Sequence, residues 1–256
     1  MDSSKHTSIF ITGASSGIGS ALAKLYAKPE LHLTLTGRNA ERLKVVAEVC
    51  RAQGASVEEM ILDVCNAEEM EFKIQEADQK HPLTLVIANA GLGLQGQNDS
   101  PEATRHIFST NLGGVLNTVL PTINLMKKRQ SGQLALMSSL ASFKGYATKS
   151  AYCGSKAAVR IYGEGLRESL APHNIKVSVI CPGFIKTPLT DFNSFKMPFL
   201  MLPEKAALFI QKGLEKNSSR IAFPWPTYIG AILMASLPPF FAEKISSWLP
   251  YHQEKK

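Results

Sequence analysis

The sequence predicts an α/β fold built on one doubly wound parallel sheet of about seven strands, with helices on both faces. Short apolar runs alternate along the chain with longer segments of helical character, as in successive βαβ units. Two of the runs, "TLVIANA" and "VSVICPG", are almost wholly apolar, which indicates strands covered on both faces. The 256 residues contain no repeat and no Pro/Ser-rich linker, so we expect one domain over residues 1–256.

The expected elements follow one another in strict alternation. We predict strands at 8–12, 31–37, within 56–64, at 83–91, 132–140, 175–183 and 220–224. We predict helices at 17–28, 39–54, 67–80, 102–128 and 151–172. The second helix has Asn39 as its N-cap and Gly54 just past its end, the residues that helix termini favour.

The direction of the strands predicts where ligands bind. Parallel strands joined by right-handed crossovers form a doubly wound sheet, and such sheets bind ligands outside the carboxyl ends of their strands. We therefore look for functional residues immediately after each predicted strand.

A glycine-rich turn follows the first strand and opens the first helix. "TGASSGIG" places Gly13, Gly17 and Gly19 there. Glycine permits a tight turn and close backbone approach, and the N–H groups at a helix N-terminus bind phosphate. The position of the turn favours a dinucleotide pyrophosphate site; the alternative is a tight turn without a ligand.

The end of the second strand predicts which dinucleotide binds. NAD sites place a carboxylate at this point for the ribose 2′-hydroxyl, but here "TLTGRN" has Gly37 and then Arg38. A guanidinium would bind a 2′-phosphate by charge-assisted hydrogen bonds. We therefore expect NADP(H), read by Arg38 with help from Asn39 and Ser15; the alternative for Arg38 is a solvated loop cation.

Tyr152 and Lys156 lie four residues apart at the head of the helix predicted over 151–172. Four residues is about one helical turn, so both side chains share a face. Alone, the pair is equally consistent with an ordinary surface tyrosine beside a lysine. The remaining motifs decide between these interpretations.

Together the motifs resemble the short-chain dehydrogenase/reductase family, whose domain is of the Rossmann type. "TGASSGIG", "NAG" (89–91), "STNLGG" around Asn111, "MSS" (137–139), "YCGSK" (152–156) and "PGFIKT" (182–187) occur in the family's order and at suitable spacings. The resemblance covers roughly residues 7–190.

The resemblance implies a role for each matching residue. Tyr152 would be the catalytic acid/base, Lys156 would lower the pKa of that tyrosine and bind the nicotinamide ribose, Ser139 would orient the substrate, and Asn111 would complete a proton relay. The implied cofactor-binding residues are Gly13, Ser15, Ser16, Gly17, Ile18, Gly19, Arg38, Asn39, Asp63, Val64, Asn89, Ala90, Gly91, Tyr152, Lys156, Pro182, Gly183, Ile185 and Thr187.

This set predicts an oxidoreductase that interconverts a carbonyl and a secondary alcohol. A free tyrosine has a pKa near 10, and a nearby ammonium favours its phenolate. Ser139 can hold the carbonyl oxygen while Tyr152 supplies a proton, and NADPH supplies the hydride. The alternative is a non-catalytic NADP(H)-binding sensor or scaffold, which would not need the four catalytic residues.

Composition excludes several other classes. There are 28 Lys and Arg against 21 Asp and Glu, a net charge of +7, but the basic residues form no stripe with aromatics, so we expect no nucleic-acid partner. The six histidines have no metal-ligand spacing, and the four cysteines are scattered, as expected of free thiols in a reducing compartment. With no apolar leader and no run of about 18 apolar residues, we expect a cytoplasmic protein.

The segment after "PG" carries the weak information about substrate. Residues 184–209 contain Phe184, Phe192, Phe195, Met197, Phe199 and Met201. This composition suits a lid over a bulky apolar substrate, lipid-like or steroid-like, and it equally suits ordinary packing of a small subdomain.

An apolar extension at about 225–250 ends the chain. "TYIGAILMASL" (227–237) and "PFFAEKISSWL" (239–249) read as two short helices separated by Pro238 and Pro239, which forbid one continuous helix. We expect the extension to pack on the body near the substrate opening, and as a second possibility to contact a membrane surface peripherally. We also expect a homo-oligomer, as is common in the family.

Overall fold

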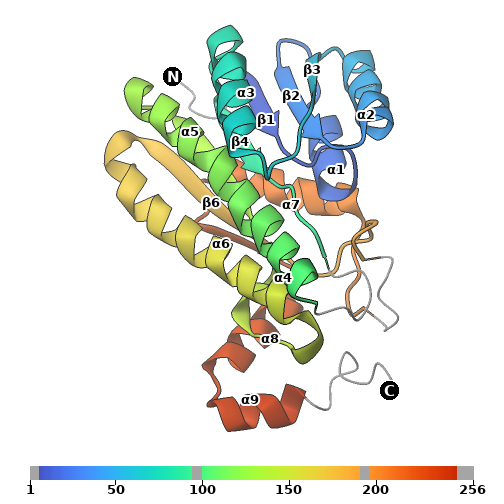
Figure 1. Cartoon of the computed structure of the whole chain (residues 1–256), viewed down its shortest axis with the longest axis vertical. Coiled ribbons are helices and arrows are strands. Elements are labelled where there is room, and N and C mark those ends of the chain that lie inside the picture. The colour runs from blue at the N-terminus through green and yellow to red at the C-terminus, as the bar shows by residue number, and fades with distance from the viewer. Residues whose placement is uncertain (1–5, 94–99, 191–196, 247–256) are drawn as a thin grey trace.

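The computed structural model describes residues 6–93, 100–190 and 197–246, and its seven strands form one sheet (Figure 1). The strands are β1 (Ser8–Ile11), β2 (His32–Gly37), β3 (Ser56–Ile61), β4 (Leu85–Ala88), β5 (Gly132–Met137), β6 (Ile175–Pro182) and β7 (Arg220–Phe223). All neighbours are parallel, in the order β3-β2-β1-β4-β5-β6-β7. The predicted doubly wound sheet is confirmed, with the order reversing between β1 and β4.

Helices cover both faces of the sheet. Those in the described part of the chain before its C-terminal extension are α1 (Gly17–Tyr26), α2 (Ala40–Ala52), α3 (Ala67–Lys80), α4 (Pro101–Phe108), α5 (Gly114–Arg129), α6 (Ser150–Leu170) and α7 (Pro203–Glu215). One apolar core joins α1, α2 and α7 to the sheet, and a second joins α3, α5 and α6 to its other face. The predicted N-cap is confirmed, because the Asn39 side chain accepts a hydrogen bond from the Arg42 N–H at 2.8 Å.

The single helix predicted over 102–128 is wrong in one respect. A π-helical segment, η1 (Ser109–Gly113), separates α4 from α5. Single π turns within α-helices are frequent at functional sites. Helical periodicity alone does not reveal a π turn, and in this one the Asn111 side chain makes hydrogen bonds with the distant residue Leu92.

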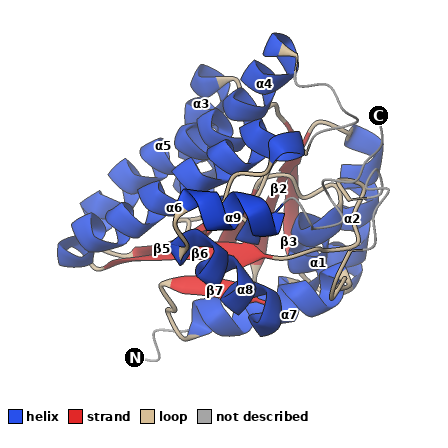
Figure 2. Cartoon of the chain, turned by 90° about the horizontal axis from the view of Figure 1, so that it is seen from below, coloured by secondary structure: helices blue, strands red, loops and turns tan. Residues whose placement is uncertain are grey.

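The C-terminal extension forms two short helices, α8 (Trp225–Ser236) and α9 (Pro239–Ser246), at the end of the molecule where α6 begins (Figures 1 and 2). The break predicted at Pro238 and Pro239 is confirmed. α8 lies against β7 and against the 3₁₀ turn η2 (Leu140–Phe143). None of the helices described is long and apolar enough to cross a membrane.

Candidate active site

The glycine turn after β1 has the backbone geometry that a phosphate site needs. Gly13 has φ +65° and Gly17 has φ +55°, conformations that side-chain-bearing residues rarely adopt. A Cβ at Gly19 would lie 2.6 Å from the Asn89 amide nitrogen, so glycine is required there too. Ser16 occupies the N-cap of α1 without a side-chain capping bond. The N–H groups of this helix start are therefore left for another acceptor.

Thr12 and Asn89 fix this turn to the end of β4. The Thr12 hydroxyl accepts hydrogen bonds from the Asn89 and Ala90 N–H groups, each at 3.0 Å. The Asn89 amide donates to the Thr12 carbonyl at 2.9 Å and to the Gly13 carbonyl at 3.2 Å. Asn89, which we expected beside the adenosine ribose, thus uses its side-chain N–H groups to hold the backbone of the turn. Sequence reasoning missed Thr12, whose only signal is its place just before Gly13.

The end of β2 is crowded on one side and carries an exposed arginine. A Cβ at Gly37 would lie 3.1 Å from the Ser15 hydroxyl, so a longer residue would crowd this side of the turn. Arg38 approaches Asp63 at 4.0 Å, and about half of each side chain is exposed. The pKa of Asp63 is lowered, mainly by the hydrogen bond from the Cys65 N–H and to a smaller degree by Arg38. The guanidinium is thus only loosely paired within the protein.

Val64 has a packing role in this structure. It is buried, and a Cβ on Gly114 would come within 2.5 Å of its side chain. Its carbonyl accepts a hydrogen bond from the Asn117 amide at 2.8 Å. Val64 therefore holds α5 against the loop after β3, and its predicted contact with the cofactor stays a prediction.

Lys156 is the buried cation of the site. It is 4% exposed, and its Nζ donates to the Met137 carbonyl at 2.8 Å. Burial lowers its pKa from 10.5 to about 8. A Cβ on Gly91 would lie 3.2 Å from this Nζ and 3.1 Å from the Asn111 side-chain oxygen. Lys156 and Asn111 therefore border the same small space, which the missing side chain of Gly91 keeps open.

Asn111 ties three elements together from the π turn. Its side-chain oxygen accepts from the Leu92 N–H at 2.7 Å, and its amide donates to the Leu92 carbonyl at 3.0 Å. The same amide donates to the Ser155 hydroxyl at 3.1 Å, and Ser155 in turn donates to the Tyr152 carbonyl at 2.8 Å. Ser155, inside the "YCGSK" motif, was missed as a link between the asparagine and the tyrosine.

Tyr152 and Ser139 meet as the spacing predicted. Ser139 follows β5, and its side chain is near enough to the Tyr152 phenol to act on the pKa of that phenol. Burial nevertheless raises the pKa of Tyr152, and the Ser139 side chain only opposes that rise. The expectation that Lys156 lowers this pKa is wrong for the protein alone, because the ammonium is directed at the Met137 carbonyl. The phenol is therefore held in its neutral, proton-donating form.

The end of β6 and the loop after it lie next to Ser139 and the glycine turn. The Ser139 hydroxyl lies 3.5 Å from the Pro182 carbonyl, and the Gly183 N–H donates to the Phe223 carbonyl at 2.8 Å. Ile185 is buried and pairs with Met201. Thr187 reaches the glycine turn, because a Cβ on Gly17 would lie 2.9 Å from the Thr187 methyl.

Part of the predicted lid falls outside the described residues, which omit Phe192 and Phe195. Of the remaining members, Met201 is buried at the pairing with Ile185, whereas Phe199 is 60% exposed. The Met201 side chain is therefore in the core and the Phe199 side chain is at the surface, a difference that the sequence did not predict.

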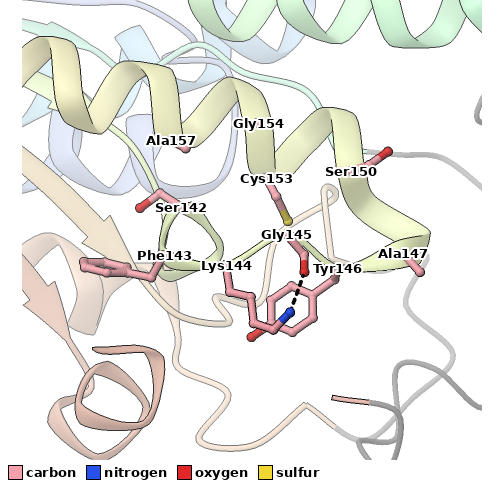
Figure 3. A pocket seen from close by; sticks show the side chains of 10 residues that line it. All are labelled: Ser142, Phe143, Lys144, Gly145, Tyr146, Ala147, Ser150, Cys153, Gly154 and Ala157. Atoms are coloured by element: carbon pink, nitrogen blue, oxygen red, sulfur yellow. Dashed lines mark hydrogen bonds between the residues drawn. The ribbon is translucent and has the colours of Figure 1, made fainter. Parts of the chain in front are cut away.

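A hollow of about 520 Å³ has none of the four candidate catalytic residues in its lining (Figure 3). It is lined by Ser142, Phe143, Lys144, Gly145, Tyr146, Ala147, Ser150, Cys153, Gly154 and Ala157. Tyr146 is thus a pocket-wall residue. Cys153 is 2% exposed, and burial raises the pKa of its thiol, which agrees with a packing role and not with a nucleophile.

Comparison with known proteins finds matches that extend over most of the chain. The sequence model of the family described as short chain dehydrogenase matches residues 7–196. An uncharacterized oxidoreductase of Myxococcus xanthus is 35% identical over 237 residues, which cover 90% of this chain and 93% of that protein.

Solved structures share the fold at lower identity. A short-chain dehydrogenase from Sphingobium yanoikuyae in complex with NADPH has a TM-score of 0.78 at 22% identity, covering 91% of this chain and 96% of that one. A short-chain dehydrogenase from Mycobacterium paratuberculosis bound to NAD has a TM-score of 0.74 at 22% identity, covering 84% and 94%. At these identities the likeness concerns the fold.

Proposed function

The chain belongs to the short-chain dehydrogenase family and is an oxidoreductase of that family; from this premise we propose that it interconverts a carbonyl and a secondary alcohol with NADP(H). The observation that carries the proposal is the cluster of Tyr152, Ser139, Lys156 and Asn111 at the carboxyl edge of the sheet. Its members are connected by the approach of Ser139 to the Tyr152 phenol, by the Asn111–Ser155–Tyr152 chain of hydrogen bonds and by the space beside Gly91 that Lys156 and Asn111 share.

The residues present fit a dinucleotide. Two glycines with positive φ and an α1 N-terminus without a side-chain cap suit a pyrophosphate. Lys156 is a buried ammonium with three donors, of which the Met137 carbonyl takes one. A ribose hydroxyl in the space beside Gly91 would supply a further acceptor for it.

When bound, the cofactor supplies or accepts the hydride. Ser139 holds the substrate oxygen by a hydrogen bond, and Tyr152 donates a proton to that oxygen during reduction. The raised pKa of Tyr152 keeps the phenol protonated until the oxygen develops negative charge. Asn111 fixes the first turn of α6 through Ser155, which orients Tyr152. Lys156 holds a buried ammonium beside Asn111, where it can bind a ribose hydroxyl of the cofactor.

The preference for NADP(H) rests on the end of β2. Gly37 supplies no carboxylate to repel a 2′-phosphate, and Arg38 is half exposed with only a 4.0 Å approach to Asp63. A phosphate would therefore gain a charge-assisted, bidentate partner at small cost to the protein. Solved relatives hold NADPH in one case and NAD in another, so this chain's own residues carry the argument.

An apolar substrate, lipid-like or steroid-like, is the class that the surroundings favour. Phe184, Met197 and Met201 follow the end of β6, and α8 brings an uncharged helix against η2, the turn that begins at Ser139. Apolar pockets with few polar groups bind such molecules.

The proposal includes a homo-oligomer that pairs through α5 and α6. Each of these helices exposes a large apolar side chain, Leu120 at 50% and Ile161 at 57%. Exposed apolar residues on neighbouring helices suit a subunit interface. Sedimentation equilibrium of the wild type and of Leu120→Glu/Ile161→Glu tests this: a wild type that sediments as a monomer would reject it.

The test of function is a carbonyl panel read with NADPH and Tyr152→Phe. We expect reduction of an apolar ketone by the wild type and a loss of at least about 10²-fold in kcat for the variant, with NADPH affinity unchanged. Retention of near wild-type turnover by Tyr152→Phe would contradict the assigned role. NADPH binding with no turnover across the panel would favour a non-catalytic sensor or scaffold instead.

A further inference from the structure

The outer surfaces of α8 and α9 expose large apolar side chains. On α8, Trp225, Ile229 and Leu233 follow one another at intervals of four residues, which places them along one side of the helix. On α9, Phe240, Phe241 and Ile245 are exposed as well, and the two phenylalanine rings contact each other at 5.5 Å. These six side chains are between 42% and 71% exposed. Apolar surface gathered in this way marks an interaction site.

A different side of α8 is fixed to the body, because Tyr228 lies about 100° around the helix from Ile229, the middle residue of the exposed stripe. The Tyr228 ring packs edge-on against Phe143 at 5.7 Å, and its hydroxyl accepts a hydrogen bond from Arg220 at 3.1 Å. Arg220 is also held by Glu164 of α6. This network anchors α8 through Tyr228. The stripe of Trp225, Ile229 and Leu233 takes no part in it and stays exposed. Exposed apolar surface on an anchored helix marks a site of interaction with another apolar surface.

Charge decides between the possible occupants of this surface. α8 carries no charged residue, and α9 carries only Glu243 and Lys244. α8 lies against η2, and the segment 139–150 that contains η2 adds Lys144 and Lys149 and no acidic residue. The whole chain has a net charge of +7. A second copy would bring the same positive charge to the contact, whereas an anionic lipid surface attracts it.

We propose that α8 and α9 dock onto an anionic lipid bilayer, with the apolar side chains of both helices in the interfacial layer and the lysines against headgroup phosphates. Short helices with an apolar side and flanking basic residues bind in the interface without spanning it. α8 lies against the turn that begins at Ser139, so docking places the catalytic edge of the sheet beside the membrane. Only the corollary, that an apolar substrate enters from the bilayer, rests on the proposed function.

Vesicle sedimentation of the full chain tests the docking. The probes are vesicles of phosphatidylcholine alone and of phosphatidylcholine with about one-third phosphatidylserine. The variant Leu233→Glu/Phe240→Glu breaks both helical surfaces; the matched control, Val45→Glu/Phe72→Glu, makes the same charge change at side chains 59% and 62% exposed on α2 and α3. We expect the wild type and the control to bind anionic vesicles, and the variant's partition coefficient to fall at least about tenfold.

The fluorescence of Trp225 reports directly on whether the exposed surface of α8 contacts lipid. In a Trp248→Phe background Trp225 is the remaining tryptophan of the chain, and its emission should shift to shorter wavelength with anionic vesicles but not in buffer. Melting temperature and NADPH affinity show that each variant is folded, and neither depends on lipid.

Three results would overturn the docking. One is absence of wild-type binding to anionic vesicles. Another is equal loss of binding in the variant and the control. The third is a change of oligomeric state in the Leu233→Glu/Phe240→Glu variant without any vesicle binding by the wild type, which would assign the surface to a second copy. A protein inactive on every carbonyl that still binds vesicles would refute the proposed function and leave the docking intact.

Discussion

Replacing Lys156 by methionine should make the protein more stable at neutral pH while removing its activity. Lys156 is 4% exposed, and burial lowers its pKa from 10.5 to about 8. At pH 7 the side chain is charged in both the folded and the unfolded protein, so the folded state bears the whole cost of burying the ammonium. A methionine of similar length removes that cost.

The size and the pH range follow from the shift. A difference of about 2.5 pKa units corresponds to about 3 kcal/mol of unfolding free energy at 1.36 kcal/mol per unit. Loss of the hydrogen bond to the Met137 carbonyl offsets about 1 kcal/mol, which leaves a net gain of about 2 kcal/mol below pH 8. Between pH 8 and 10.5 the unfolded wild type binds more protons than the folded one. The wild type therefore gains stability with rising pH, and the variant's advantage disappears.

Urea unfolding without cofactor at pH 7 and at pH 10 measures this difference. Lys128→Met, an exposed lysine on α5, controls for loss of a positive charge and should change stability little at either pH. If Lys156→Met is less stable than the wild type at pH 7, or if the difference between them does not change with pH, the burial cost assigned to Lys156 is refuted. Loss of turnover by the variant is expected in both cases.

Three further substitutions test other parts of the structure. Arg38→Ala should weaken NADPH binding by about tenfold or more and leave NADH binding nearly unchanged in titrations; equal effects on both would reject the phosphate-reading role. Tyr228→Phe keeps the ring but removes the acceptor for Arg220, so chemical denaturation should show a loss of about 1 kcal/mol, and no loss would show that α8 is anchored otherwise. Gly114→Ala should cost about 1–3 kcal/mol of unfolding free energy, because its Cβ would lie 2.5 Å from Val64, and Val64→Ala in the same chain should restore part of it; a cost unaffected by Val64→Ala would contradict this.

The sequence alone determined the sheet and identified most of the candidate catalytic residues. Alternating apolar runs predicted seven strands, because period and apolar content are local properties of the chain. Tyr152 and Lys156 share a helical face by spacing, and Ser139 follows a strand that ends beside them. These predictions required only helix geometry and the rule that ligands bind at the carboxyl ends of parallel strands.

The tertiary structure decided what depends on residues far apart in the chain. Asn111, in the π turn, makes side-chain hydrogen bonds with the backbone of Leu92, nineteen residues away. The direction of the Tyr152 pKa shift depends on burial, which no local pattern reports. The anchoring of α8 depends on Arg220, which reaches both Tyr228 and a glutamate of α6 fifty-six residues earlier. Sequence periodicity identified two apolar helices, but only the packing shows which side of α8 is held and which is exposed, because burial is set by neighbours that the chain brings together on folding.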